Sequence, residues 1–279
     1  PELIRSAYSI NVDGGGPEIR GGKPAVLSVE TAEKVFLSYT LTVRNPGGHS
    51  SLPTPDNAIY RLAQALERLA SLRFPLRSNA ATRGYYATLA RDYSGALAAD
   101  MRAVARAPSD PAALARLAAS SVYNNAQLRT TCVPTLLQGG QAENALPQVA
   151  RATINCRLLP DEDPDRVDAA LRQAVADPGV EIARIAPPQP SPPSPVDAAL
   201  FAQVATVAQG LWGPMPVTPY MSAGASDSVF LRAAGMPSYV FNGIAYDVDD
   251  DRSHGQDERI LVDAYYRSLE FDYRLLKNL

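Results

Sequence analysis

The sequence has few cysteines, few histidines and no long apolar run, and each shortage excludes a class of protein. Two cysteines in 279 residues are too few for a disulfide framework. No apolar stretch approaches the roughly 18 residues that a membrane-spanning helix needs, and no charged segment with an apolar leader begins the chain. Lys and Arg number 26 against 29 Asp and Glu, with no basic run, so nucleic acid and anionic membranes are poor candidate partners.

The sequence does contain enough apolar material for folded domains joined at proline-rich segments. Hydrophobic residues make up 46% of the chain and charged residues 20%, which suffices for buried cores in about two domains. The 24 prolines are clustered, and the run over residues 187–195 predicts a stiff, extended spacer. The chain starts at Pro1 without an initiator methionine, and residues 1–7 read like the end of a helix, so we expect it to begin within a domain.

Hydrophobic periodicity predicts two kinds of module along the chain. Alternation of apolar and polar residues predicts half-buried strands over residues 35–43 and 149–158. The segment 54–57, with Thr54 as capping residue and Pro55 at the first helical position, leads into a helical pattern over residues 57–70. The other expected elements are strands 8–12, 128–137 and 239–241, mostly helical residues 84–125, and helices over residues 163–175, 200–211, 229–235 and from 260 onward. The fold class that follows is an α+β module, residues 34–186, inserted into an α/β domain made of residues 1–33 and 187–279.

Candidate metal ligands lie after two of the predicted strands. Asp13 follows strand 8–12 and precedes three glycines, which permit positive φ or a close backbone approach, and His254 lies in a polar loop after strand 239–241. The carboxyl ends of strands are where α/β sheets bind ligands, and zinc binds carboxylates and imidazoles. Two ligands do not complete a zinc site, and the sequence has no His-x-Asp and no Glu-Glu to supply the others. The acidic run 247–251 lacks the ligand spacing of a calcium loop and is expected to be solvated.

The two cysteines are equally distant in sequence from Asn144, which lies between strands 128–137 and 149–158. If these strands form an antiparallel pair about that centre, Cys132 and Cys156 face each other and can form a disulfide. Two small buried apolar side chains are the alternative. A disulfide favours a periplasmic or secreted protein, so localisation stays open between these and the cytoplasm.

Four separated motifs together resemble one enzyme family. They are Asn-Val-Asp-Gly-Gly-Gly (11–16), Asn-Pro-Gly-Gly-His-Ser-Ser (45–51), Glu-Asn-Ala-Leu-Pro (143–147) with Asn-Cys-Arg-Leu-Leu-Pro (155–160), and Ser-His-Gly-Gln-Asp-Glu-Arg (253–259). In this order they resemble the di-zinc metallopeptidases that include glutamate carboxypeptidase, aminoacylase and succinyl-diaminopimelate desuccinylase, above all the carboxypeptidase-S-like branch. The resemblance implies a partial α/β catalytic domain with an inserted α+β lid and dimerisation domain, zinc as cofactor, and a homodimer. Strand 35–43 and helix 57–70 could supply its self-complementary edge.

The resemblance also implies roles for single residues. It makes Asp13 a ligand of one zinc ion and His254 a ligand of the other, where the metal pair activates water and polarises an amide carbonyl. It makes His49 the catalytic histidine that reaches the active site of the partner subunit and stabilises the tetrahedral oxyanion. Asn144 and Arg157 match lid residues that bind substrate near its carboxylate and scissile group. Taken alone, Arg157 would be a charge on a strand face and Asn144 a turn residue.

Two parts of the family pattern differ from this sequence. The loop over residues 223–227, which ends in Asp227, corresponds to a Gly-Gly-Thr-Asp-like loop that lines the substrate pocket, although its residues depart from that pattern. The family's first histidine, bridging aspartate and Glu-Glu pair would all precede Pro1, so we expect this chain alone to be inactive. The expected function of the complete site is zinc-dependent hydrolysis of a peptide or N-acyl amino acid next to a free carboxylate. The alternative is a non-catalytic dimeric binding module that keeps the carboxylate pocket.

Overall fold

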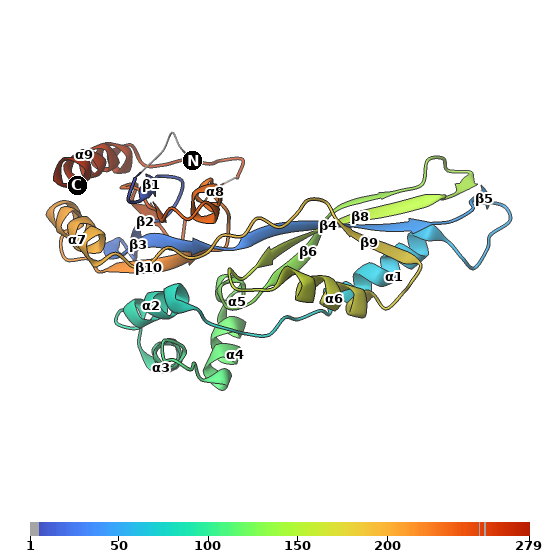
Figure 1. The fold of residues 1–279 in the computed structure, drawn as a ribbon, viewed down its shortest axis with the longest axis horizontal. Coiled ribbons are helices and arrows are strands. Elements are labelled where there is room, and N and C mark those ends of the chain that lie inside the picture. Colours follow the sequence, from blue (N-terminus) through green and yellow to red (C-terminus); the bar gives the residue numbers. More distant parts are fainter. Residues whose placement is uncertain (1–5, 251, 254) are drawn as a thin grey trace. The chain divides into compact units, whose positions relative to one another are not determined.

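The computed structural model describes residues 6–250, 252–253 and 255–279, which form two compact units. The first unit combines the residues up to Glu33 with Leu76–Leu128 and Ser191–Leu279. The second unit combines Lys34–Pro75 with Arg129–Pro190. Figure 1 labels the helices and strands of both units. No helix in the described part of the chain is both long and apolar enough to cross a membrane.

The first unit is built on a six-stranded mixed sheet. Its strands follow the order β1-β11-β3-β2-β12, and β10 also pairs with β3. They are β1 (Ser9–Asn11), β2 (Gly16–Arg20), β3 (Lys23–Glu33), β10 (Val217–Ser222), β11 (Ser238–Val240) and β12 (Tyr246–Asp247). β1 is parallel to β11, and β10 is parallel to β3, whereas β2 and β3 are antiparallel. The predicted strands 8–12 and 239–241 are therefore neighbours in one sheet.

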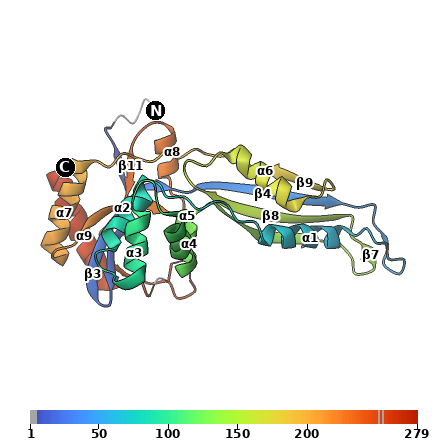
Figure 2. The same ribbon diagram turned by 90° about the horizontal axis from the view of Figure 1, so that it is seen from below.

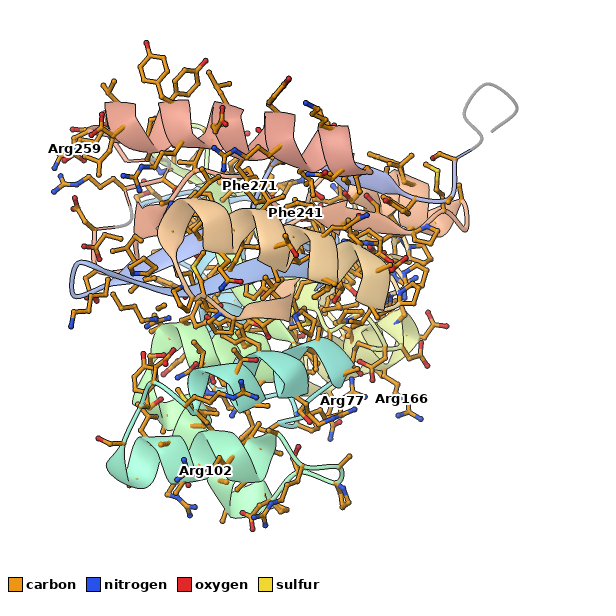
Figure 3. All side chains as sticks on the ribbon, turned by 90° about the vertical axis from the view of Figure 1, so that its left-hand side faces the viewer. Arg77, Arg102, Arg166, Phe241, Arg259 and Phe271 are labelled. Atoms are coloured by element: carbon orange, nitrogen blue, oxygen red, sulfur yellow. A yellow bond between two sulfur atoms is a disulfide. The ribbon has the colours of Figure 1, made fainter. Side chains whose placement is uncertain are left out.

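Helices cover both faces of this sheet (Figure 2). Successive side chains of a strand point to opposite faces, and β3 has apolar side chains on both, so each face is buried under helices. Leu27 packs with α7 (Ala198–Trp212) and α9 (Val262–Asn278). On that side Phe241, after β11, meets Phe271 of α9 with ring centroids 6.3 Å apart (Figure 3). Val26 packs instead with a layer of short helices, namely α2 (Ala80–Leu89), α3 (Gly95–Val104), α4 (Pro111–Ser120) and α5 (Val122–Leu128). The α/β class predicted for this part of the chain is confirmed.

Three features of the first unit differ from the sequence-based expectations. Strand β3 was not expected, because it is buried on both faces and its residues do not alternate regularly in polarity along its length. The helical residues 76–128 fall in this unit rather than in one continuous insertion, because their apolar faces pack on Val26 and Tyr220. The proline run is extended but anchored, since Ser194 is buried and its Oγ donates to the Ser238 carbonyl at 2.8 Å.

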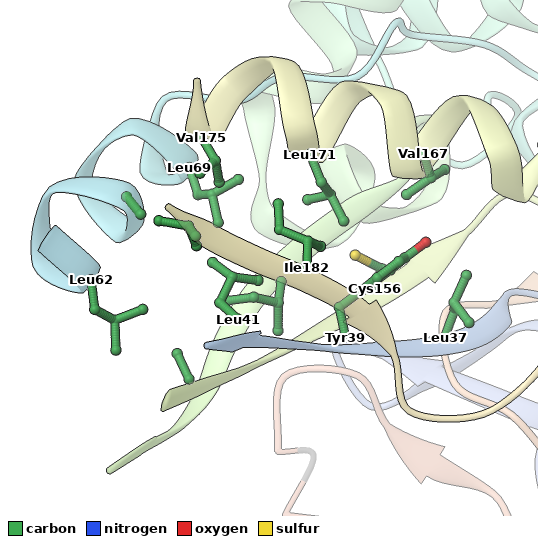
Figure 4. Packing of buried hydrophobic residues seen from close by; sticks show 14 of the residues in the cluster. Leu37, Tyr39, Leu41, Leu62, Leu69, Cys156, Val167, Leu171, Val175 and Ile182 are labelled. Carbon is green, nitrogen blue, oxygen red and sulfur yellow. The ribbon is translucent and has the colours of Figure 1, made fainter. Parts of the chain in front are cut away.

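The second unit has the element order β-α-β-β-α-β and a four-stranded antiparallel sheet. Its strands follow the order β6-β8-β4-β9, with bounds Thr131–Gly139, Val149–Leu158, Val35–Arg44 and Val180–Arg184. Helices α1 (Ala58–Ala70) and α6 (Pro164–Val175) pack on one face of it, and Figure 4 shows the apolar side chains between them. The alternation predicted one buried face on each of β4 and β8, and this prediction is confirmed. The buried apolar residues are Val35, Leu37, Tyr39, Leu41 and Val43 on β4 and Ala150, Ala152, Ile154, Cys156 and Leu158 on β8.

A disulfide joins the two strands that the cysteine spacing predicted to pair. Cys132 on β6 lies opposite Cys156 on β8 in the antiparallel register, and the two sulfurs are bonded. The predicted hairpin register is therefore confirmed, and the alternative of two separate buried thiols is excluded. Cys156 is fully buried in the core of the second unit, so the bond connects an edge strand to that core.

Replacing both Cys132 and Cys156 by alanine is expected to lower the free energy of unfolding of the second unit by about 3 kcal/mol. The bond spans a sequence separation of 24, so its loss gives the unfolded chain a large loop entropy. Amide hydrogen exchange in β6 and β8 measures the change. Reduction of the unmodified protein by a thiol reductant is the matched control and should give the same loss. Unchanged exchange in both samples would contradict the prediction.

Candidate active site

A pocket of about 440 Å³ in the first unit contains Asp13. Asp13 follows the carboxyl end of β1, Glu30 lies on β3, and Ser222 ends β10. Arg252 and Arg259, from the segment after β12, line another part of the wall. The structure therefore places the predicted ligand Asp13 at the end of a sheet strand and next to acidic, basic and hydroxyl side chains.

Glycine after Asp13 brings the backbone against the sheet. Gly15 has φ +59°, and a Cβ on it would lie 2.6 Å from the carbonyl oxygens of both Ser28 and Val240. No other residue fits there without moving β3 or β11, so glycine is required both for the backbone angle and for the space. The close approach predicted from the three glycines is confirmed, and it fixes the position of Asp13 relative to Glu30.

Glu30 and Glu33 on β3 share one buried guanidinium, that of Arg232 on α8 (Ser228–Ala233). Arg232 Nη1 lies 3.0 Å from Glu33 Oε1 and 3.7 Å from Glu30 Oε1, and the three side chains are at most 4% exposed. Burial raises the pKa of Glu30 to about 8, against the opposing charge of Arg232. Neither glutamate was identified from the sequence. Two acidic residues among the apolar and hydroxyl side chains of residues 25–33 were the available signal.

Glu33 also holds the loop that was expected to line the pocket. Its Oε2 accepts hydrogen bonds from the backbone N–H of Ser226 at 2.6 Å and from Ser226 Oγ at 3.0 Å, while its Oε1 accepts from Ser191 Oγ at 3.1 Å. Asp227 is the last residue of this loop and is exposed. Among the described residues, Ser222 lines the Asp13 pocket and Asp227 does not. The structure thus brings the start of the loop to the pocket, but not the predicted binding residue.

His49 and Asn144 lie together at one end of the second unit. The two-residue strands β5 (Gly48–His49) and β7 (Ala145–Leu146) pair there, and the Ser50 N–H donates to the Asn144 carbonyl at 3.1 Å. Both side chains are exposed. His49 Nδ1 lies 2.7 Å from Ser51 Oγ and accepts from the Ser51 N–H at 3.2 Å. An acceptor at Nδ1 leaves the ring proton on Nε2, so the exposed nitrogen of a neutral His49 is a donor.

Arg157 lies near the other end of the same sheet. Its guanidinium stacks on the Phe36 ring at 4.6 Å, and its Nε donates to Asn155 Oδ1 at 3.3 Å. Its Nη1 is buried and has no hydrogen-bond partner among the described residues. Burial lowers the pKa of Lys34 to about 7, with Arg157 as a second cause, and Lys34 Nζ donates to the Arg129 carbonyl at 2.7 Å. Arg157 therefore offers positive charge to an anionic group at this end of the second unit, whereas Lys34, which was not identified from the sequence, is buried beside it.

The predicted site residues fall into separate groups in the structure. Asp13 is in the first unit, whereas His49, Asn144 and Arg157 are in the second. His254 lies outside the described residues. In the part of the chain that the structure describes, no three His, Cys, Asp or Glu side chains come close enough to hold a metal ion. These residues alone therefore do not fit a zinc ion, which needs three or four protein ligands.

Comparison with known proteins identifies relatives about twice as long as this chain. The N-fatty-acyl-amino acid synthase/hydrolase PM20D1 of Xenopus tropicalis is 30% identical over 93% of this chain and 51% of its own length. The probable carboxypeptidase S-like 2 of Dictyostelium discoideum is 26% identical over 94% of this chain and 50% of its own length. The chain therefore spans about half the length of the curated relatives it matches.

Solved structures show that the fold is shared. The M20 family metallo-carboxypeptidase Sso-CP2 of Sulfolobus solfataricus matches with a TM-score of 0.67 and 18% identity, over 99% of this chain and 64% of that protein. The di-peptidase Dug1p of Saccharomyces cerevisiae matches with a TM-score of 0.62 and 12% identity, over 97% of this chain and 57% of that protein. Residues 31–183, more than half of the chain, match the family model described as the peptidase dimerisation domain, M20_dimer. The chain therefore belongs to the M20 peptidase family, and it has that family's combination of a catalytic α/β fold and a dimerisation domain.

Proposed function

We propose that this chain supplies part of the active site of a zinc-dependent hydrolase, which cleaves the amide bond of a peptide or N-acyl amino acid next to a free carboxylate. The observation that carries the proposal is the position of Asp13 in a pocket of an M20 family chain. Two relatives support it, since one is named an N-fatty-acyl-amino acid synthase/hydrolase and another a carboxypeptidase S-like protein. The disulfide supports an oxidising compartment, periplasmic or extracellular.

Each predicted residue has a chemical task in this proposal. Arg157 binds the substrate carboxylate, because its planar fork has a buried N–H group without a partner in the described structure. His49 donates from Nε2 to the oxyanion of the tetrahedral intermediate, and Asn144 binds substrate beside it. Asp13 and His254 are the metal ligands of this chain. The chain alone is expected to bind no zinc pair and to be inactive, because its sequence lacks a His-x-Asp and a Glu-Glu.

Hydrolysis of a matched substrate series tests the function. The full-length enzyme, of which we expect this chain to be one part, is assayed with N-acyl amino acids, with dipeptides, and with the C-terminal amides of both, before and after removal of metal by a chelator. We expect turnover only of substrates with a free carboxylate, and only with metal bound. Binding of these compounds without turnover, in protein that contains zinc, would contradict hydrolysis and support the non-catalytic binding module instead.

The positions of Arg157 and His49 within one subunit favour a homodimer. Arg157 pairs with Phe36 near the start of β4, whereas β5, which contains His49, follows the end of β4. The eight residue steps from Val149 to Arg157 along β8 alone span about 26 Å. One small substrate cannot contact both side chains of the same copy. We infer that His49 serves the pocket of the partner subunit.

The exposed edge strand β6 is the surface that we propose for the dimer contact. The sequence suggested strand 35–43 and helix 57–70 as the dimer edge. The strand part of this assignment is wrong, because β4 lies between β8 and β9. β6 is at the edge of the sheet, and its Leu136 and Leu137 are 62% and 68% exposed. An apolar edge strand of this kind pairs readily with another chain.

A variant with both Leu136→Asp and Leu137→Asp is expected to be monomeric, because two charges would be buried in the contact. Size-exclusion chromatography with light scattering measures the mass of each species. Phe230→Asp is the control, since Phe230 is 60% exposed but lies on α8 in the first unit. A dimer that survives the double substitution would show that β6 is not in the interface.

A further inference from the structure

An aromatic ring lies against Arg157 on the face of the second unit's sheet that α1 and α6 leave open. Phe36 on β4 is directly opposite Arg157 on β8 in the antiparallel register. The centroid of the Phe36 ring is 4.6 Å from Arg157 Cζ. At this distance the ring quadrupole attracts a guanidinium that stacks on its face. The ring therefore supports one face of the Arg157 guanidinium.

An amide side chain holds the edge of the same guanidinium. Arg157 Nε donates to Asn155 Oδ1 at 3.3 Å, and Asn155 is two residues earlier on the same face of β8. Asn155 Nδ2 in turn donates to Ser38 Oγ at 3.0 Å, which leaves the amide oxygen to accept from Arg157. The ring and the amide together fix the tilt and the rotation of the guanidinium plane.

This guanidinium has no acid beside it within the described structure. Arg157 forms no ion pair with a described residue, and of its N–H groups only the one on Nε has an acceptor there. Lys34 is close enough that the charge of Arg157 contributes to lowering its pKa. Two cations side by side without an acid favour the approach of an anion. The Arg157 side chain is only half-buried, so an anion in solution can reach its exposed part.

Phe36 has no place in the hydrophobic core. Its side chain is 51% exposed, whereas its neighbours Val35 and Leu37 point to the other face of β4 and are buried. A large ring left half in water adds little to folding, but its face is available to a cation. Ile185 is a matched position, because it is 55% exposed and its N–H donates to the Ser38 carbonyl at 2.8 Å, on the side of β4 away from β8.

We propose that Phe36 is a positioning residue for substrate binding, which holds the Arg157 guanidinium so that its unpaired N–H groups meet the substrate carboxylate in the plane of the fork. Recognition of a carboxylate by arginine depends on this planar alignment, so a guanidinium that must first be ordered binds more weakly. The inference rests on the proposed function in taking Arg157 as the carboxylate-binding residue. It deepens that function by assigning the residue that orients Arg157.

Calorimetric titration of the full-length enzyme with two matched ligands tests the proposal without turnover. N-acetyl-L-alanine has a free carboxylate, and N-acetyl-L-alaninamide has a neutral amide in its place. We expect Phe36→Leu to weaken the binding of N-acetyl-L-alanine by about threefold to thirtyfold, because leucine is apolar but has no ring face. Phe36→Tyr, which keeps the ring, and the control Ile185→Ala should each stay within about twofold. Binding of the amide should be the same in all of these proteins.

The variant Arg157→Gln separates failure of this inference from failure of the proposed function. If Arg157→Gln weakens the binding of N-acetyl-L-alanine and Phe36→Leu does not, Arg157 binds the carboxylate without help from the ring, and only the inference is overturned. If Arg157→Gln has no effect, or the unsubstituted enzyme binds the acid and the amide equally, the carboxylate role of Arg157 is wrong and the inference falls with it.

A spectroscopic signature distinguishes positioning from a purely structural role of Phe36. In the ¹⁵N-arginine-labelled enzyme, the Nε–Hε signal of Arg157 reports the hydrogen bond to Asn155. Phe36→Leu should speed the exchange of this proton with water by at least about threefold, because the released guanidinium breaks that hydrogen bond more often. Phe36→Tyr should leave the exchange unchanged. Equal exchange in the two variants would overturn the proposal.

Discussion

Replacing Arg232 by methionine is expected to lower the free energy of unfolding of the first unit by about 3–5 kcal/mol. The guanidinium is 1% exposed, lies 3.0 Å from Glu33 Oε1, and donates from Nη2 to the Ser238 carbonyl at 2.9 Å. Methionine preserves most of the side-chain volume but leaves two buried carboxylates, Glu30 and Glu33, without a counter-charge. Removing one partner of a buried ionic group costs more than the group as a whole contributes, because the remaining charges stay desolvated.

The fluorescence of Trp212 during urea denaturation measures this loss, because Trp212 is the single tryptophan and lies in the first unit. Arg274→Met is the control. Arg274 also forms an ion pair, with Glu270 at 2.6 Å, but it is 45% exposed on α9, so we expect a loss below about 1 kcal/mol. Adding Glu33→Gln to the Arg232→Met variant should restore part of the stability. Equal losses for the two arginine variants would show that the buried cluster contributes no more than a surface pair.

The second unit was predictable from the sequence because its sheet has one buried face. The buried apolar residues of β4 and β8 are alternate residues, so the polarity pattern of each strand indicates both the strand and its orientation. The helix α1 was predictable from the spacing of its apolar residues, although its start was placed too early, at Thr54 and Pro55. The Asn57 side chain accepts hydrogen bonds from the N–H groups of Ile59 and Tyr60, as a capping residue does. Each of these signals depends on residues that are close together in the chain.

The Glu30, Glu33 and Arg232 cluster was not predictable in the same way. Arg232 on α8 is at least 199 positions from the two glutamates on β3 (232 − 33 = 199). No local pattern indicates that these side chains meet. The strand β3 that contains both glutamates is covered on both faces, and its polarity alternates only over residues 27–30, so no regular pattern runs along it. The resemblance to the family motifs placed Asp227 at the pocket, whereas Ser222, and not Asp227, lines its wall within the described structure.

Replacing His49 by alanine is expected to lower kcat of the native enzyme by about 100-fold and to leave its zinc content unchanged. The hydrogen bond from the Ser51 N–H to Nδ1 keeps the ring proton on Nε2, so the neutral imidazole can donate to a developing oxyanion. Steady-state kinetics and metal analysis of the same sample measure both quantities. Loss of zinc from the variant would contradict the oxyanion role and would make His49 a metal ligand or a structural residue.

Mixing two inactive variants tests whether His49 acts on the partner subunit. In a heterodimer of His49→Ala and Asp13→Ala, the subunit that keeps Asp13 receives His49 from the other subunit, so one of the two active sites is intact. If subunits exchange freely, half of the dimers in a 1:1 mixture are such heterodimers, and half of their sites are complete. The mixture should therefore regain roughly a quarter of the native activity (1/2 × 1/2). Each variant alone should regain none on the same treatment. If the mixture stays inactive although heterodimers are detected by mass, His49 acts within its own subunit, and the inference drawn from the separation of Arg157 and His49 along β8 is wrong.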